Sequence, residues 1–194
     1  MLSMPPLKIL VLGDGETGKT SVIRRLVHDS FRSQHVASKP GVEFHLCEVL
    51  YDGKVVHLQL WDVNGAVPKV YFKDMFGALL IYDVTRPSTF DTVLKWKKLL
   101  DDHEKVPVVL LGNKQDMESA QADEEALESF RESNGFAAHL DTSAKTGRNV
   151  REAALKLVAN IAQHRDAFSK KHNDHILFRP NDAITQQGDD PCCY

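Results

Sequence analysis

The sequence predicts an α/β fold, in which a six-stranded, mostly parallel sheet includes one antiparallel hairpin strand and has helices on both faces. Short apolar runs alternate along the chain with longer segments of helical period, which is the pattern of parallel strands joined by right-handed crossovers. A phosphate-binding pattern follows the first apolar run, and Asp52-Gly53 between the second and third runs is typical of a two-residue hairpin. The 194 residues are enough for one domain with a sizeable core.

The expected strands are short apolar runs, and they lie at residues 7–12, 44–51, 55–62, 77–83, 107–112 and 136–141. The expected helices carry apolar residues at helical spacing, and they lie at residues 19–28, 90–103, 121–133 and 148–168. In the helix at 90–103 we interpret Lys95, Lys97 and Lys98 as a solvated face, because the aspartates that follow neutralise them. Ligands of such a sheet bind beyond the carboxyl ends of its strands, so the loops at that edge form the candidate site.

The loop after the first strand has a phosphate-binding sequence. It runs Gly13-Asp14-Gly15-Glu16-Thr17-Gly18-Lys19-Thr20 and fits the pattern G-x-x-x-x-G-K-[ST]. We expect these residues, and Ser21 that follows them in the expected helix, to bind the nucleotide. Its glycines let several backbone N–H groups point at one anion, and the helix N-terminus adds its positive dipole end. We expect Lys19 to reach the β- and γ-phosphates and the Thr20 hydroxyl to ligate Mg²⁺. A glycine-rich surface turn is the alternative, but the strand–loop–helix setting favours a nucleoside di- or triphosphate site.

The loop after the fifth expected strand indicates which base is bound. It reads Asn113-Lys114-Gln115-Asp116. The Asp116 carboxylate can accept hydrogen bonds from the ring N–H and the exocyclic amine of guanine, whereas adenine offers no such donor pair. We expect Asn113 to tie this loop to the phosphate loop, and the stem of Lys114 to lie along the base. Taken alone, N-K-x-D could equally be a polar strand-to-helix turn.

A third loop follows the last expected strand, and it reads Asp141-Thr142-Ser143-Ala144-Lys145. We expect a backbone N–H of Ser143-Ala144-Lys145, that of Ala144, to donate to the guanine carbonyl. Three loops at three strand ends, in this order, predict that the ligand is GTP or GDP with Mg²⁺, and not ATP.

Composition limits the other functions. The net charge of −3 shows no excess of basic residues of the kind that binds nucleic acid. No apolar run is long enough to cross a bilayer and no charged-then-apolar leader is present, so we expect a protein that is neither integral nor secreted. Three cysteines, two of them adjacent, do not make a disulfide framework, and we interpret Cys47 as a small core or sheet residue. The nine histidines have no zinc-ligand spacing, so Mg²⁺ is the metal we expect.

The three loops resemble those of the Ras superfamily of small GTPases, and more closely its Rab branch, over about residues 7–165. Trp61-Asp62-Val63-Asn64-Gly65 is similar to the family element W-D-x-x-G, so the resemblance implies that Asp62 helps to hold Mg²⁺ through a water and that the Gly65 N–H senses the γ-phosphate. Segments similar to those that distinguish Rab proteins are GVEF at 41–44, HLQLW at 57–61 and LIYDVT at 80–85. The phosphate loop also resembles that of Ran, but a Ran-like tail would be acidic and without lipid. The resemblance implies a P-loop small-GTPase fold for residues 1–168.

Both switch segments depart from the family pattern. Ala66 stands where the family has the glutamine that orients the attacking water, so we expect weak hydrolysis and assign no catalytic residue. The next segment, residues 67–72, is shorter than the second switch of a Rab protein. In the first switch Lys39 falls in the place of the threonine that closes on Mg²⁺, and Ser38 could take that role if the loop shifts register. If the loop does not shift, the Lys39 ammonium would either repel the ion or pair with the γ-phosphate directly, and the sequence alone does not decide among these alternatives.

Two other residues of the site have more than one interpretation. Glu16 puts an acid into the phosphate loop. We expect its side chain to point outward, because in such a loop the backbone N–H groups point inward and bind the phosphates. Phe31 matches the aromatic residue that packs edge-on against the guanine in the family, although a role in the core explains it nearly as well.

We expect residues 169–194 to form a disordered, hypervariable tail. It ends Pro191-Cys192-Cys193-Tyr194, which resembles the Rab ending in which paired cysteines carry geranylgeranyl groups, and unmodified cysteines are the alternative. Two lipids anchor a protein stably without a basic patch. The resemblance therefore implies a protein lipid-anchored to the cytoplasmic face of an endomembrane, with a cytosolic pool.

Two functions compete. The first is a Rab-like switch in vesicle trafficking that recruits effectors through the exposed aromatic residues Phe44, Trp61 and Tyr71. Its partners would be guanine nucleotide, effector, exchange-factor and escort proteins and a membrane surface, but no nucleic acid. The second is a scaffold that is hydrolysis-deficient and constitutively GTP-bound, or insensitive to nucleotide. A Ran-like transport GTPase is a lesser alternative.

Overall fold

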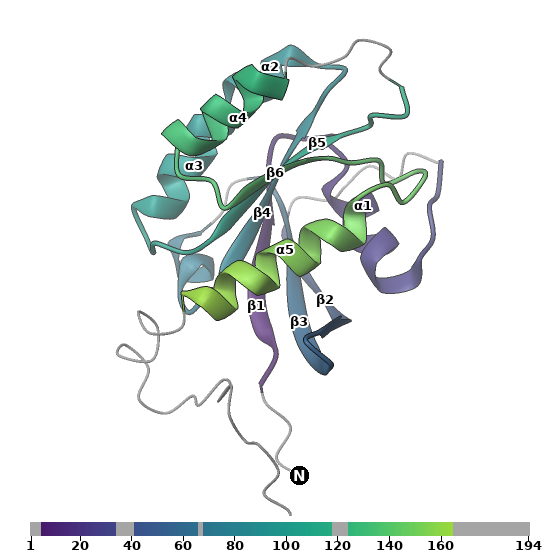
Figure 1. Ribbon diagram of the computed structural model, residues 1–194, viewed down its shortest axis with the longest axis vertical. Coiled ribbons are helices and arrows are strands. Elements are labelled where there is room, and N and C mark those ends of the chain that lie inside the picture. The colour runs from purple at the N-terminus through teal and green to yellow at the C-terminus, as the bar shows by residue number, and fades with distance from the viewer. Residues whose placement is uncertain (1–4, 34–40, 66–67, 118–123, 165–194) are drawn as a thin grey trace, which may run out of the picture.

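A computed structural model of the chain describes residues 5–33, 41–65, 68–117 and 124–164. They form a six-stranded sheet with helices on both faces (Figure 1), which confirms the predicted fold class. The strands are β1 (Leu7–Leu12), β2 (Gly41–Tyr51), β3 (Lys54–Asn64), β4 (Gly77–Asp83), β5 (Val108–Asn113) and β6 (Ala138–Asp141). The helices are α1 (Lys19–His28), α2 (Pro87–Asp91), α3 (Val93–Asp101), α4 (Glu124–Ser133) and α5 (Val150–Gln163), and η1 (Lys69–Phe72) is a 3₁₀ turn.

The strand order is β2-β3-β1-β4-β5-β6, and every pairing is parallel except that of β2 with β3. These two strands form the hairpin predicted from Asp52-Gly53, and both turn residues have positive φ angles of 49° and 70°. Such angles match the type I′ turn whose twist suits a hairpin. The hairpin is longer than predicted, because its ladder extends to Gly41 opposite Asn64.

Each face of the sheet is covered by its own helices. The face under α1 and α5 holds Ile9 and Val11 of β1, and the face under α2, α3 and α4 holds Leu10 and Leu12. Because β1 is buried on both faces, its sequence is a continuous apolar run and does not alternate. Within the described part of the chain, no helix has both the length and the apolarity needed to cross a membrane.

The predicted helix at 90–103 is wrong in two respects. It is divided at Thr92 into α2 and α3, and Lys97 is buried, so it does not belong to a solvated face. The ammonium of Lys97 lies 2.5 Å from Oδ2 of Asp101 and 5.7 Å from the ring centroid of Phe136. The long apolar stem of a lysine can be buried while its charge is paired, which a count of charges does not reveal.

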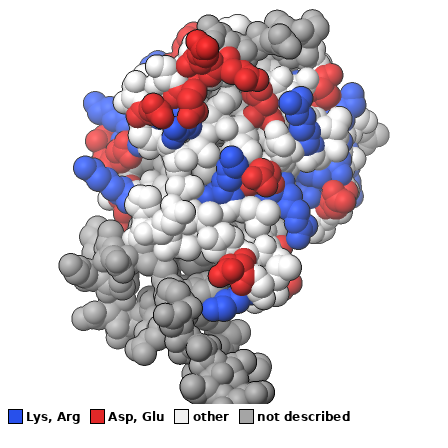
Figure 2. Space-filling model, in the orientation of Figure 1, with Lys and Arg blue, Asp and Glu red and all other residues white. Residues whose placement is uncertain are grey.

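The face of the molecule in Figure 2 intersperses acidic and basic side chains with uncharged ones. Cys47 is buried on β2, as predicted. The predicted tail at 169–194 and its cysteines, Cys192 and Cys193, lie outside the described residues, and so do Ser38, Lys39 and Ala66.

Candidate functional site

The phosphate loop is shaped by two glycines that no other residue could replace without strain. Gly13 has a φ of 138°, and a Cβ atom there would lie 2.0 Å from the carbonyl oxygen of Ile81. Gly18 has a φ of 96°, and its Cβ would lie 2.3 Å from Nδ2 of Asn113. The loop is therefore pressed against β4 on one side and against the N-K-x-D loop on another, which fixes the path of its backbone.

Lys19 is buried at the start of α1, where its ammonium donates to the carbonyl oxygens of Gly13 at 3.0 Å and Asp14 at 2.8 Å. Burial lowers the pKa of Lys19, and the nearby charges of Asp62 and Asp14 partly oppose that shift. A desolvated ammonium held by two carbonyls inside a phosphate-binding loop is placed to meet an anion.

Thr20 and Asp62, the two residues predicted to hold Mg²⁺, lie side by side. The Thr20 hydroxyl donates to Oδ2 of Asp62 at 2.5 Å. The other carboxylate oxygen of Asp62, Oδ1, is buried and has no hydrogen-bond partner among the described residues. A buried carboxylate oxygen without a partner is costly unless an ion or water meets it. The donor set of a hydroxyl and a carboxylate fits a hydrated Mg²⁺, which prefers oxygen ligands.

Asn113 ties the three predicted loops together. Its amide Nδ2 donates to the carbonyl of Thr17 in the phosphate loop at 2.8 Å, as expected. Its Oδ1 accepts from the backbone N–H of Ala144 at 3.1 Å. The predicted guanine donor is thus bound to Asn113 in this structure, so the role of Ala144 toward the base stays a prediction. One buried side chain fixes the distance between the phosphate loop and both predicted base loops.

The Asp116 carboxylate is held ionised and in place by the third loop. Ser143 donates its hydroxyl to Oδ1 at 2.6 Å, and the Lys145 ammonium lies 3.4 Å from Oδ2. Burial would raise the pKa of Asp116, but the hydrogen bond from Ser143 and the contacts of Lys145 hold the pKa below its ordinary value. An ionised carboxylate is an acceptor only, which is what the N–H groups of guanine require.

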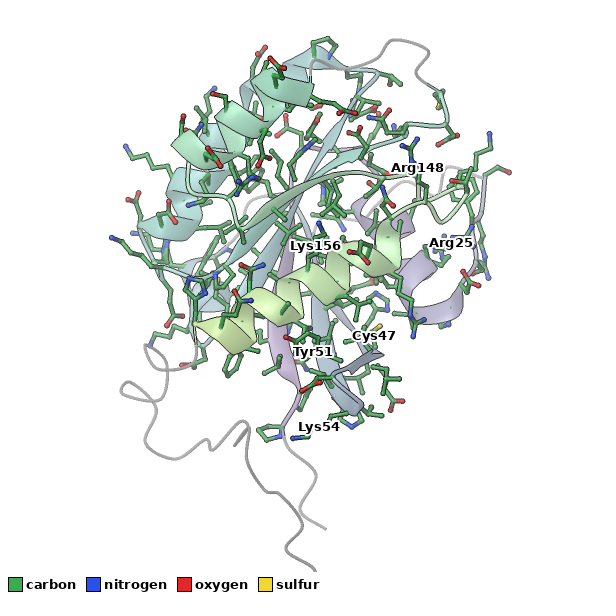
Figure 3. All side chains as sticks on the ribbon, viewed as in Figure 1. Arg25, Cys47, Tyr51, Lys54, Arg148 and Lys156 are labelled. Carbon is green, nitrogen blue, oxygen red and sulfur yellow. The ribbon has the colours of Figure 1, made fainter. Side chains whose placement is uncertain are left out.

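Sequence reasoning missed Arg25, which braces the third loop from α1. Its Nε donates to the carbonyl of Ala144 at 3.0 Å, and its Nη2 donates to that of Lys145 at 2.7 Å. Figure 3 shows Arg25 on α1 close to the loop that leads into α5. No motif marks Arg25, because its partners are far along the chain.

The side chain of Asp14 points away from the predicted phosphate position. It accepts from the Thr92 hydroxyl and from the indole N–H of Trp96, both at 2.8 Å. Only the backbone of Asp14 is thus left to face a phosphate. Glu16 also points outward as expected, since its side chain is 70% exposed.

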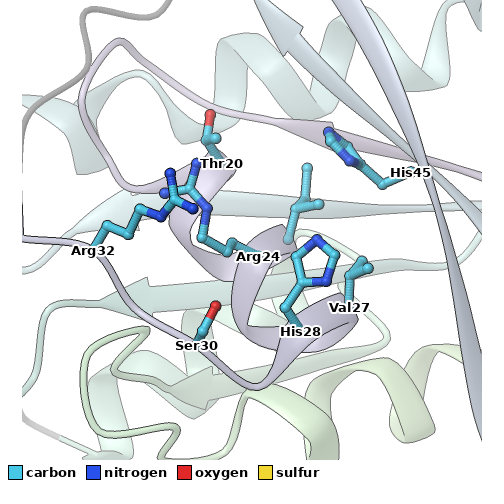
Figure 4. A pocket seen from close by; sticks show the side chains of 8 residues that line it. Thr20, Arg24, Val27, His28, Ser30, Arg32 and His45 are labelled. Carbon is cyan, nitrogen blue, oxygen red and sulfur yellow. The ribbon is translucent and has the colours of Figure 1, made fainter.

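Phe31 is 37% exposed, so the interpretation of Phe31 as a core residue is wrong. Next to it a cavity of about 480 Å³ opens beside Thr20, between α1 and β2 (Figure 4). Arg24, Arg32 and His45 contribute polar groups to its lining. These side chains place positive or protonatable groups beside the predicted Mg²⁺ position.

The three predicted effector aromatics form one cluster. The rings of Phe44 and Trp61 have centroids 6.0 Å apart, and those of Trp61 and Tyr71 are 5.7 Å apart. Phe44 is 57% exposed, while Trp61 and Tyr71 are partly buried. Lys8 supports the cluster, because its ammonium lies 4.5 Å from the Trp61 ring centroid and donates to the carbonyl of Lys73 at 2.7 Å.

Comparisons with known proteins agree with this geometry. Residues 8–163 match the model of the Ras family. The chain is 37% identical to the Ras-related protein Rab-32 of Homo sapiens, in an alignment of 201 positions that covers 96% of the chain and 88% of that protein. It is 40% identical to Rab-32A of Dictyostelium discoideum over 94% of the chain and 85% of that protein. It is 34% identical to Rab-7L1 of Homo sapiens over 81% of the chain and 83% of that protein.

Proposed function

The chain belongs to the Ras family of small GTPases and to its Rab group, and we propose that it is a Mg²⁺-dependent guanine-nucleotide switch with slow intrinsic hydrolysis. Rab proteins bind GTP and act in membrane trafficking. The observation that carries the proposal is the position of Asn113, whose amide joins Thr17 of the phosphate loop to Ala144 of the third loop. Such a tie sets the spacing between a phosphate site and a base site.

The residues proposed to contact nucleotide are those of the three loops, with Phe31 beside the base and the Gly65 N–H at the γ-phosphate. Thr20 and Asp62 would hold Mg²⁺, which would offset the negative charge of the β- and γ-phosphates. Lys19 would bind the same phosphates, and Asp116 would select guanine. The contacts of Lys19 and Asp116 described above support these roles.

Slow hydrolysis is proposed from Ala66, because a methyl group cannot orient an attacking water, and phosphoryl transfer depends on such positioning. Lys39 supports the second candidate, a scaffold that stays loaded with GTP, since it falls where the family has a threonine.

The nucleotide carried by the purified protein tests both candidates. It is released by denaturation and identified by chromatography. Mostly GDP would indicate a switch that hydrolyses GTP, and mostly GTP would indicate the loaded scaffold.

Lys19→Ala should weaken GTP binding by about tenfold or more, because it removes the buried ammonium. Lys95→Ala, which removes an exposed lysine of α3, is the matched control. Equal affinity in both variants would refute the phosphate site.

We also propose that Cys192 and Cys193 carry lipid and hold the protein on an endomembrane, on the resemblance of the Cys-Cys ending alone. Changing both cysteines to serine should move the protein from the membrane to the soluble fraction of cells. Continued membrane association of that variant would refute the anchor.

The cluster of Phe44, Trp61 and Tyr71 is proposed as the effector surface. Phe44 is its exposed ring, and Trp61 and Tyr71 are partly buried beside it, which corrects the expectation that all three are exposed. The cluster suits a protein partner, because Trp and Tyr are enriched among the residues that dominate binding energy at interfaces. Phe44→Ala should leave nucleotide affinity unchanged and abolish effector capture by the GTP-loaded protein. Capture at the level of the unaltered protein would count against this surface.

A further inference from the structure

The outer face of the phosphate loop is fastened by Arg86, a residue that no motif marks. Its Nη2 donates to the carbonyl of Gly15 at 2.7 Å, and its Nη1 lies 3.8 Å from Oε2 of Glu16. Its Nε donates to Oδ2 of Asp83 at 3.1 Å. The planar guanidinium thus contacts the phosphate loop through Nη1 and Nη2 and the end of β4 through Nε.

Asp83 connects the same guanidinium to the predicted base loop. Its carboxylate is 1% exposed, and Oδ2 also lies 2.6 Å from the ammonium of Lys114. Its Oδ1 accepts from the backbone N–H and the hydroxyl of Thr85 at 3.0 and 2.7 Å. Both oxygens of this buried carboxylate are thus paired, so the Asp83 side chain is held in one position. Arg86 is therefore held by a group that also holds the lysine of N-K-x-D.

Glu16 gives this contact an electrostatic role. It has a left-handed φ of 63°, and it places a negative charge in a loop that would surround phosphates. Its side chain points outward and is 70% exposed, so the repulsion acts through solvent, and an uncompensated carboxylate in this loop would weaken the hold on nucleotide by an amount that salt screens. Among the described residues, Arg86 is the cation within ion-pair distance of Glu16.

We propose that Arg86 is a positioning residue that fastens the phosphate loop from outside and sets the rate of nucleotide release. It holds the Gly15 carbonyl in place, compensates the charge of Glu16, and joins both to the base loop through Asp83. This inference rests on the proposed binding of guanine nucleotide. Loss of Arg86 frees the loop to open and exposes bound phosphate to the Glu16 carboxylate, so release accelerates while association changes little.

The test is the dissociation rate of a fluorescent GDP from the full chain in the presence of Mg²⁺. Arg86→Ala should accelerate release about tenfold, with the association rate within about twofold of the unaltered protein. Arg86→Lys keeps the positive charge but loses the planar set of guanidinium N–H donors. Its dissociation rate should therefore lie between those of Arg86→Ala and the unaltered protein. Lys95→Ala removes an equal charge from α3 and should release at the unaltered rate.

The electrostatic part is tested by salt and by Glu16→Gln. Added salt screens repulsion between Glu16 and phosphate, so it should slow release from Arg86→Ala and leave the unaltered protein nearly constant. In the Glu16→Gln background, Arg86→Ala should accelerate release less than about threefold, because the Gly15 and Asp83 contacts are lost but no charge at position 16 is left uncompensated. A loss of general stability would produce neither effect.

The outcomes separate this inference from the proposed function. If the unaltered protein binds GDP and Arg86→Ala releases it at the rate of Lys95→Ala, the inference is overturned while the nucleotide site stands. If the unaltered protein binds no fluorescent GDP, both proposals fall. If Arg86→Ala is faster but does not respond to salt or to Glu16→Gln, the charge compensation is refuted.

Discussion

The Thr20 hydroxyl at the start of α1 donates a 2.5 Å hydrogen bond to the Asp62 carboxylate near the end of β3. The contact exists because β1 and β3 run parallel in register, with Val11 opposite Asp62, so that the end of β3 lies beside the loop that follows β1. Two residues that are 42 positions apart in the chain thereby meet at the predicted Mg²⁺ position.

Removal of Mg²⁺ should accelerate nucleotide release, and Thr20 should be needed for that response. In the unaltered protein, EDTA should raise the GDP dissociation rate by about tenfold or more, because the metal offsets phosphate charge. Thr20→Ala should release GDP fast with or without EDTA. Ser88→Ala, which removes an exposed hydroxyl on α2, is the control and should respond like the unaltered protein. A full EDTA response in Thr20→Ala would contradict the metal assignment.

Asp116→Asn should change the base that is bound. The asparagine amide has one acceptor and one donor group, so it cannot accept two hydrogen bonds from guanine, and GDP affinity should fall by about tenfold or more. The same amide can pair with a base that carries a carbonyl in place of the exocyclic amine. Xanthosine diphosphate should therefore bind this variant better than GDP does, as measured by competition with fluorescent nucleotide. Asp102→Asn, an exposed change at the end of α3, should bind GDP normally.

Gly13→Ala should destabilise the fold far more than Gly135→Ala. Both glycines have positive φ, at 138° and 66°, but a Cβ at Gly13 would lie 2.0 Å from Ile81 O, whereas that at Gly135 meets nothing within 4 Å. We expect a loss of about 3 kcal/mol or more in the free energy of unfolding for Gly13→Ala. The loss for Gly135→Ala should be about 1 kcal/mol, the cost of the left-handed conformation. Urea unfolding of the two variants measures this difference, and equal losses would show that the contact with β4 does not constrain the loop.

Stability should fall as the pH is lowered through the range of His139. Burial lowers the pKa of His139 below its ordinary value of 6.5, although Asp141 and Glu128 partly oppose that shift, and the ring bonds the Tyr82 hydroxyl at 3.1 Å. The unfolded chain therefore takes up the proton first, so the free energy of unfolding declines as the pH falls below about 6.5. Above that pH both states are neutral, and His139 adds no dependence.

The measurement is urea unfolding at several pH values between about 7.5 and 5. His139→Gln should have a smaller slope of stability against pH than the unaltered protein. His164→Gln removes an exposed histidine after α5 and should keep the full slope. If the slope of His139→Gln equals that of His164→Gln, burial of His139 is not the cause.

The sequence by itself determined the sheet, the hairpin and the identity of the three loops. Asp52-Gly53 needs positive φ at two adjacent residues, and the glycines of the phosphate loop need close backbone approach, so these are local demands that local sequence records. The tie from Asn113 to the phosphate loop is not local, since it spans 96 positions of the chain, and it could be predicted only because both of its ends belong to motifs.

Only the tertiary structure decided how those loops are braced. Arg86 meets Gly15 across 71 positions of the chain, and Arg25 meets Ala144 across 119. Lys97 is buried with its ammonium paired to Asp101 and 5.7 Å from the ring centroid of Phe136. A long cationic side chain has the same residue type whether it lies in solvent or in such a contact. Asp101 differs from the other partners, because it lies one helical turn after Lys97, at i+4. Partners far along the chain, such as Gly15, Ala144 and Phe136, are fixed by the packing of the helices on the sheet, and no spacing along the chain encodes them.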